Sequence, residues 1–277
     1  MPPTNLLLLS RAKLQAFLAC PRRFQLRSLK HLPWPAVPND AQSAEMMSRG
    51  QQFHLLMERH FLGLNPSLSS VGDEVVSGWF QAFKESKLRL PNGRYLPEHR
   101  LTVPIGDHLL LGRFDLLIVG EQEDGAPFAH IYDWKTGKAR HESVLRQDWQ
   151  TRLYLALLAE GGGALWPKGR FPNARHSIQP EYITMTYWYA TEPELPRVIV
   201  YSQAEHTRNW AEIQTIVAQI DEHLAQDEWP KTDDWVHCRH CAYQVYCGRQ
   251  AADVNQRELV DEPVADDIDW FLEPQLP

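Results

Sequence analysis

Three consecutive strand-like segments between residues 98 and 137 constrain the fold of this chain most strongly. They are apolar, rich in β-branched and aromatic residues, and span residues 98–105, 108–120 and 129–137. A tight turn at Gly106-Asp107 separates the first two, and the polar loop "EQEDGAP" separates the last two. Connections this short join neighbouring antiparallel strands, so the pattern predicts an antiparallel meander.

Helical segments precede and follow this meander in the sequence, which predicts an α/β protein. Helices are expected at 10–20, capped by Ser10, and at 41–62, 73–89, 143–160 and 205–225. Two further strands are expected at 182–190 and 197–202. We predict four regions: an N-terminal helical region 1–95 that contributes Cys20 and His54, a core 96–204, a C-terminal helix with a cysteine segment 205–250, and an acidic tail 251–277.

The third strand carries an acid and a base two residues apart, Asp133 and Lys135. Residues i and i+2 of a strand point to the same face, so these two side chains lie together and Trp134 lies opposite. An exposed edge strand that ends in a surface ion pair would produce the same pattern. The dipeptide spacing by itself therefore leaves both interpretations open.

A second acid, Asp115, lies within the apolar second strand. Neighbouring strands are about 4.8 Å apart, so Asp115 and Asp133 can meet across the ladder. Two adjacent carboxylates raise each other's pKa, and a bound divalent cation removes that penalty. Mg²⁺ suits such a pair because it keeps waters for a substrate phosphate, and Lys135 can hold or deprotonate the attacking water. The pattern predicts metal-assisted phosphodiester cleavage.

The spacing of Asp115 and Asp133-Trp134-Lys135 resembles the motif of PD-(D/E)xK nucleases. Gly50-x-x-x-His54 upstream and Gln150-x-x-x-Tyr154 downstream resemble the RecB-like branch, as does the opening helix with Cys20-Pro21. The resemblance covers residues 10–250. It implies a restriction-endonuclease-like α/β core, a mixed sheet flanked by helices, with the N- and C-terminal segments tied by a four-cysteine cluster.

The same resemblance implies roles for individual residues. Metal, Mg²⁺ or Mn²⁺, is expected on His54, Asp115, Asp133 and the carbonyl of Trp134. Lys135 is expected to be catalytic, with Gln150 and Tyr154 orienting it, the water or the nucleic acid. Glu98 opens the first strand, where the family often has an acid, and is a further candidate ligand. A structural histidine at 54 and a core tyrosine at 154 are the alternatives.

Four cysteines occur in an arrangement that suggests a ligand set: Cys238, Cys241 and Cys247 are clustered, and Cys20 is remote. Four thiolates hold either an iron–sulfur cluster or structural zinc, and His237 and His240 are spare ligands for zinc. The spacing resembles the [4Fe–4S] staple of CRISPR-adaptation nucleases and of the nuclease domain of AddB-type helicase subunits. That resemblance implies an iron–sulfur cluster, with zinc as the alternative.

The net charge of −7 is unevenly distributed, with a basic N-terminal end and an acidic C-terminal end. Residues 251–277 hold eight acids and one base, so the rest of the chain is neutral overall, whereas residues 1–50 have seven bases and two acids. A basic N-terminal region is compatible with a polyanionic partner. The tail is either a solubilising extension or a mimic of DNA. Candidate DNA-binding residues are Arg22, Arg23, Lys138, Arg140, Arg146 and Arg152.

Taken with the resemblance, these features predict a metal-dependent DNA exonuclease that prefers single-stranded ends or overhangs. A helicase or CRISPR-adaptation protein is the expected partner. The alternatives are a DNA-end-recognising subunit of a CRISPR-adaptation or recombination complex, and an RNA-processing nuclease. No apolar run approaches the ~20 residues of a membrane helix. The start has no signal-peptide pattern, which predicts a cytoplasmic protein.

Overall fold

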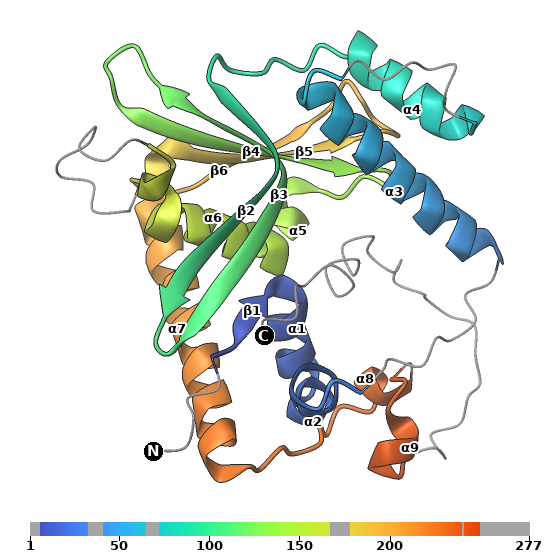
Figure 1. The fold of residues 1–277 in the computed structure, drawn as a ribbon, viewed down its shortest axis with the longest axis vertical. Coiled ribbons are helices and arrows are strands. Elements are labelled where there is room, and N and C mark those ends of the chain that lie inside the picture. Colours follow the sequence, from blue (N-terminus) through green and yellow to red (C-terminus); the bar gives the residue numbers. More distant parts are fainter. Residues whose placement is uncertain (1–5, 33–40, 65–71, 167–177, 240, 250–277) are drawn as a thin grey trace. The chain divides into compact units, whose positions relative to one another are not determined.

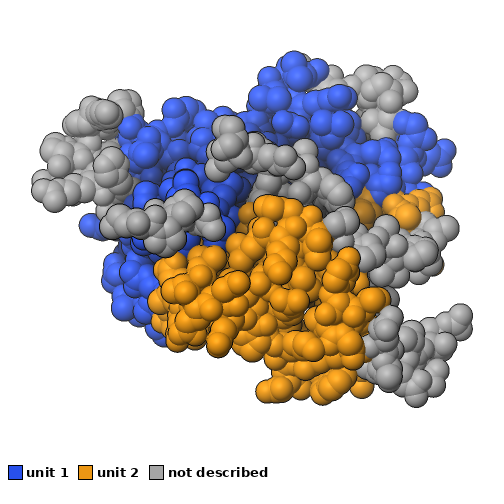
Figure 2. All heavy atoms as spheres, turned by 60° about the horizontal axis from the view of Figure 1, so that its bottom comes forward, with its two compact units in different colours: residues 1–8, 48–214 blue, residues 9–47, 215–277 orange. Residues whose placement is uncertain are grey.

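The computed structural model describes residues 6–32, 41–64, 72–166, 178–239 and 241–249 (Figure 1). Two compact units divide the chain (Figure 2). Unit 1 comprises residues 1–8 and 48–214, and unit 2 comprises residues 9–47 and 215–277. His54 thus belongs to unit 1 and Cys20 to unit 2. The acidic tail lies outside the described residues.

A mixed six-stranded sheet forms the centre of unit 1, which contains all of its strands except the last two residues of β1. Its strands are β1 (Leu8–Ser10), β2 (Arg94–Ile105), β3 (His108–Glu121), β4 (Pro127–Lys135), β5 (Ile183–Tyr189) and β6 (Arg197–Val200). The order is β1-β3-β4-β5-β6, with β2 paired to β3. The predicted meander β2–β3–β4 is antiparallel, as expected, whereas β4 and β5 run parallel. β2 begins at Arg94, four residues earlier than predicted.

β4 occupies the interior of this sheet, between β3 and β5. The side chain of Asp133 near its end is only 2% exposed. The alternative of an exposed edge strand that ends in a surface ion pair is therefore wrong. An acid buried in a central strand needs specific partners, because removing a carboxylate from water without compensation is costly.

The helices of unit 1 lie on both faces of the sheet (Figure 1). They are α4 (Glu74–Glu85), α5 (Glu142–Gln147) and α6 (Trp149–Gly161), with parts of α3 (Ala41–Phe61) and α7 (Gln203–Gln226) and the short 3₁₀ turns Gly162–Leu165 and Pro180–Tyr182. None of the helices in the described ranges is long and apolar enough to span a bilayer.

The single helix predicted at 143–160 is in fact two helices, α5 and α6, which meet at Asp148. Asp148 has extended backbone angles, φ −65° and ψ 139°. Its carboxylate accepts a hydrogen bond from the backbone N–H of Gln150 at 2.9 Å. A side chain that caps the helix N-terminus in this way satisfies a donor that the helix itself leaves open. The break therefore starts α6 at a defined residue, next to Gln150.

The two residues Asp133 and Trp134 show which helices cover which face. Trp134 belongs to a buried cluster with Phe53 and Met57 of α3 and Phe80 of α4. Asp133 instead contacts Gln150 of α6. Consecutive strand residues point to opposite faces. Hence α3 and α4 pack on one face of β4, and α6 packs on the other.

β3 changes face at Asp115. Phe114 packs edge-on against Tyr154 of α6, with ring centroids 5.0 Å apart, whereas Leu116 belongs to the cluster with α3 and α4. In a regular strand these two residues would share a face. The alternation therefore slips by one residue at Asp115, which leaves its carboxylate at the boundary between the two helical layers.

β2 makes the same change at Glu98. Tyr95 packs against the cluster with α3 and α4, whereas Val103 lies against Gly161 of α6. Glu98, between them, has a φ of +49°, which is uncommon for a residue other than glycine. Strained backbone of this kind concentrates at functional sites.

Unit 2 combines the N-terminal helices with the residues that follow 215. Its helices are α1 (Arg11–Ala19), α2 (Pro21–Phe24), the π-helix Gln25–Leu29, α8 (Val236–Arg239) and α9 (Gln244–Cys247). Phe24 stacks on Trp229 at 5.7 Å, and the buried Tyr243 donates its hydroxyl to the Leu32 carbonyl at 2.7 Å. Ser10 precedes α1 as predicted, but its side chain makes no capping bond.

Candidate metal-assisted active site

A row of three carboxylates crosses the sheet where β2 and β3 change face. The β2–β3 register places Glu98 opposite Asp115, and the β3–β4 register, continued one residue past Leu116 and Tyr132, places Asp115 opposite Asp133. Directly opposed residues have Cβ atoms about 4.5–5.5 Å apart. The sequence prediction that Asp115 and Asp133 meet across the ladder is compatible with this register, and the row adds Glu98.

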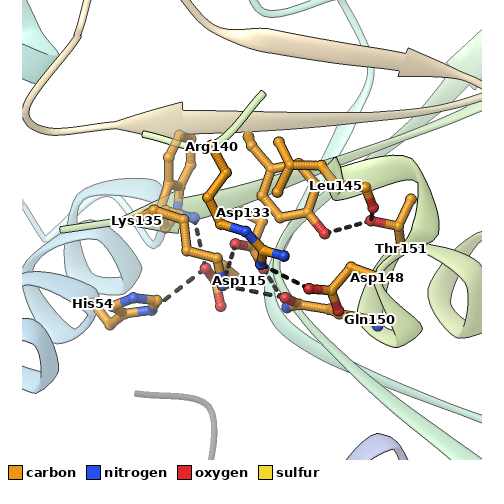
Figure 3. Close-up of polar contacts among 11 residues, drawn as sticks. His54, Asp115, Asp133, Lys135, Arg140, Leu145, Asp148, Gln150 and Thr151 are labelled. Carbon is orange, nitrogen blue, oxygen red and sulfur yellow. Dashed lines mark hydrogen bonds and ion pairs between the residues drawn. The ribbon is translucent and has the colours of Figure 1, made fainter. Parts of the chain in front are cut away.

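Asp133, Lys135 and Gln150 form a closed triangle of polar contacts (Figure 3). Lys135 Nζ lies 2.8 Å from Asp133 Oδ1, and Gln150 Nε2 donates to Asp133 Oδ2 at 2.6 Å. Gln150 Oε1 in turn accepts from Lys135 Nζ at 3.2 Å. The carboxamide therefore orients the acid and the base together.

Asp115 connects the triangle to α3. Its Oδ2 atom accepts the backbone N–H of Trp134 at 2.8 Å and lies 3.4 Å from Nδ1 of His54 (Figure 3). His54 comes from the last two turns of α3, whose apolar side packs on the opposite face of the sheet. Trp134, predicted to offer its carbonyl to a metal, is seen to hold Asp115 through its N–H group.

His54, Glu98 and Asp115 have the geometry of a cation site. Their ligand atoms all lie within 4.8 Å of one another, and no other group of three such residues in the described ranges does so. Mg²⁺ binds oxygen at 2.0–2.1 Å, so its ligand atoms lie roughly 3–4 Å apart. The three side chains need only a small adjustment to reach that spacing. Asp133, held by Lys135 and Gln150, lies outside this group.

Glu98 has an unusual protonation behaviour for an acid. Burial, and then the neighbouring charge of Asp115, raise its pKa to about 7. Arg113 offsets part of this effect, since its Nε atom lies 3.4 Å from Glu98 Oε2. Two carboxylates that share a site disfavour each other's ionisation, and a cation between them reverses that effect.

The remaining predicted residue, Tyr154, lies one turn beyond Gln150 on α6. Its side chain is 5% exposed and packs against Phe114. Sequence reasoning missed Tyr187, which lies beside Asp133 in the parallel β4–β5 register and has Lys135 Nζ 5.7 Å from its ring centre. Burial, and then the charge of Asp133, raise the pKa of Tyr187.

The predicted DNA-binding residues of unit 1 differ in their surroundings. Arg140 pairs with Asp148 at 2.8 Å beside the triangle (Figure 3), and Lys138 is exposed. Arg146 pairs with Glu142 and Glu205, and Arg152 with Glu212, so these two arginines already have carboxylate partners. Arg22 and Arg23 belong to unit 2.

All four cysteines line one pocket in unit 2, together with Arg23, Lys231 and Arg249. Cys20 and Cys238 are buried, and Cys241 and Cys247 are half-buried. Among the described residues no three of their sulfurs lie within 4.8 Å of one another. The thiols thus face a shared pocket without forming a compact ligand set. His240 lies outside the described residues.

Comparison with known proteins identifies the family. The model of the PD-(D/E)XK nuclease superfamily matches residues 8–248, so the chain belongs to that superfamily. No match was found among curated proteins. Nineteen chains of solved structures match. One, titled "Crystal structure of SSO0001", is 15% identical over 86% of this chain and 84% of that chain, with a TM-score of 0.34.

Membership explains the arrangement of the site. The fold is the mixed sheet flanked by helices of this superfamily, as predicted. Its nucleases hydrolyse phosphodiester bonds of nucleic acids with divalent metals, which is the chemistry that the carboxylate row and Lys135 can support.

Proposed function

We propose that this chain is a RecB-like, Mg²⁺- or Mn²⁺-dependent DNA exonuclease that prefers single-stranded ends or overhangs. The observation that supports it best is the carboxylate row, Glu98, Asp115 and Asp133, with Lys135 on the Asp133 face. The order of the motifs around His54 and Gln150 supports the RecB-like assignment.

The residues present fit a divalent cation. His54, Glu98 and Asp115 would hold it, with Asp133 beside them in the row. The bound cation supplies positive charge to the scissile phosphate and lowers the pKa of its water. Lys135, oriented by Gln150, holds the attacking water while its amine is protonated, or takes the proton of that water when the amine is neutral. Asp133 balances the ammonium charge, and Trp134 N–H fixes the Asp115 carboxylate.

Four substrates of one sequence test the reaction: a linear single-stranded DNA, its covalently closed circle, a duplex with an overhang, and the matching RNA. We expect Mg²⁺- or Mn²⁺-dependent release of short products from the linear strand and the overhang. Cutting of the circle at the same rate would contradict an exonuclease. Preference for the RNA would favour RNA processing.

A helicase or CRISPR-adaptation partner is part of this proposal, since an enzyme that needs single strands depends on something that exposes them. End binding without cleavage on all four substrates, in either metal, would instead favour the alternative of a DNA-end-recognising subunit in a CRISPR-adaptation or recombination complex.

We further propose that the four cysteines of unit 2 bind a [4Fe–4S] cluster. All four line one pocket, and Arg249 Nη1 donates to Cys238 Sγ at 3.1 Å, as expected for a sulfur that accepts hydrogen bonds as a ligand. A tetrahedral zinc site requires sulfurs about 3.8 Å apart, given Zn–S distances near 2.3 Å. Among the described residues no three of these sulfurs lie within 4.8 Å of one another, so they would have to move closer together to hold a single zinc ion.

A further inference from the structure

A buried chain of hydrogen bonds through Thr151 lies next to the Asp133–Lys135–Gln150 triangle (Figure 3). Thr151 Oγ1 lies 2.5 Å from the Leu145 carbonyl oxygen and 2.8 Å from the Tyr187 hydroxyl. Thr151 has one hydroxyl proton, and the carbonyl can only accept. Thr151 therefore donates to Leu145, and the Tyr187 hydroxyl donates to Thr151.

This chain of hydrogen bonds links the corner between α5 and α6 to the sheet. Leu145 is in α5, Thr151 is in α6, and Tyr187 is in β5. Thr151 and Tyr187 are each 1% exposed, so water does not compete for their bonds. The corner between α5 and α6 is thereby fixed against the sheet, and this corner contains the cap Asp148 and the first turn with Gln150.

Tyr187 also contacts the site through its ring. It lies beside Asp133 in the β4–β5 register, and the ammonium of Lys135 lies 5.7 Å from its ring centre. An ammonium within about 6 Å of an aromatic face is attracted to it. Tyr187 therefore contacts Lys135 through the face of its ring and, through its bond to Thr151, sets the position of Gln150.

We propose that Tyr187 and Thr151 are positioning residues that hold Lys135 and Gln150 in their reactive arrangement. The proposal rests on the proposed nuclease function. In this proposal neither Tyr187 nor Thr151 contacts the substrate. Their effect arises because the Gln150 carboxamide must lie within hydrogen-bond distance of both Asp133 and Lys135, and a shift of the α5–α6 corner moves it.

Conservative variants separate hydroxyl bonding from packing. Tyr187→Phe keeps the ring, and Thr151→Val keeps the shape of the side chain. Each should lower kcat on the order of 10- to 100-fold while KM stays within about twofold, because misplacement of catalytic groups acts on the reacting geometry. Thr151→Ser retains the hydroxyl and should restore kcat to near the wild-type value. The double variant should be about as slow as either single variant, since both break one chain.

Tyr201→Phe is the matched control. Tyr201 is also buried, at 2% exposed, and its hydroxyl accepts a hydrogen bond from the side chain of Asn209 in α7 at 3.3 Å. Loss of this bond should lower the unfolding midpoint without changing kcat. An unchanged kcat in Tyr187→Phe and Thr151→Val, or an equal fall in Tyr201→Phe, would overturn the proposal.

A measurement that needs no turnover separates this proposal from the nuclease assignment. The side-chain amide resonances of Gln150, assigned with Gln150→Ala, should shift in Thr151→Val and Tyr187→Phe, and should stay in place in Thr151→Ser and Tyr201→Phe. Unshifted resonances in Thr151→Val refute the positioning role even if the wild-type protein cleaves nothing. Shifted resonances in a protein without cleavage would leave the positioning role standing and contradict the nuclease assignment.

Discussion

Glu98 and Asp115 oppose each other across β2 and β3 at the one position, between Arg94 and Ile105, where the pairing of the two strands is interrupted. The backbone of Glu98 is left-handed there, and both strands change face at this position. The interruption places two carboxylates and His54 at one point, with ligand atoms within 4.8 Å. Irregular backbone, rather than regular strand geometry, produces the candidate cation site.

The protonation of Glu98 should appear in the stability of the metal-free protein. Its pKa is raised from 4.5 to about 7 in the folded state, so the folded state binds the proton more tightly. The contribution of Glu98 to the stability of the folded state should therefore fall as pH rises from about 4.5 to about 7, by on the order of 1–3 kcal/mol. Urea unfolding of the wild-type protein and of Glu98→Gln, in chelator at pH 5 and pH 8, isolates this contribution.

Glu98→Gln should remove that contribution, whereas Glu192→Gln, which breaks a surface pair with Arg197, should leave it unchanged. Added Mg²⁺ should raise the unfolding midpoint of the wild-type protein more at pH 8 than at pH 5. Equal midpoint shifts in Glu98→Gln and wild type would argue against Glu98 as a ligand.

Asp133→Asn and Lys135→Ala should each lower cleavage by on the order of 1000-fold or more, because each removes a charge that the transition state needs. The folded state should persist, since the Asn retains the shape and a hydrogen-bonding group toward Gln150. Single-turnover assays measure the rate, and near-ultraviolet circular dichroism reports the fold. Glu192→Gln provides the control that keeps full activity. Cleavage at the wild-type rate in either site variant is incompatible with the assignment.

The cysteine pocket should determine the metal content of the protein. Anaerobically purified protein should be brown, with about four irons and matching sulfide per chain. Cys238→Ser and Cys20→Ser should each lose most of the iron. Burial raises the pKa of the Cys241 thiol, so cluster binding should release protons, which a pH indicator can record. One zinc per chain, without iron or sulfide, would decide for the alternative ligand.

His130 should destabilise the protein in acid. Burial lowers its pKa to about 4, and its ring nitrogens lie 2.8 Å from Thr186 Oγ1 and 3.3 Å from the Tyr132 hydroxyl. The unfolded chain binds this proton near pH 6.5, so the contribution of His130 to stability should fall as pH drops from about 6.5 to about 4. Chemical unfolding at several pH values should show less loss of stability in acid for His130→Gln than for the wild-type protein. An equal loss in both proteins would mean that another group titrates.

The sequence predicted the elements whose patterns are long and regular. The meander followed from apolar runs with short polar loops, and its antiparallel pairing is as expected. The ordered motifs predicted the partners Asp133, Lys135 and Gln150. These features depend on local sequence, where periodicity and turn residues carry the information.

Features that depend on tertiary structure were not predicted. Asp148 reads as a helical residue within an amphipathic run, yet it caps α6, and an acid two residues before Gln150 was the available signal. The left-handed backbone of Glu98 has no local signature. Tyr187 acquires its neighbours through the parallel pairing of β4 and β5, which joins segments about fifty residues apart. Pairing over such distances is set by packing rather than by strand propensity.

The interleaving of the two units sets an order of events during synthesis. Everything in unit 1 has been translated once residue 214 is added, but unit 2 needs residues on both sides of it. Domains fold as units while the chain emerges from the ribosome. Cys20 is therefore synthesised early, whereas the other three thiols follow only after unit 1 has been translated. A chain that stops between residue 214 and Cys238 would contain the complete carboxylate row yet lack a complete thiol set, so an assembled pocket in unit 2 is a record that translation has passed Cys247.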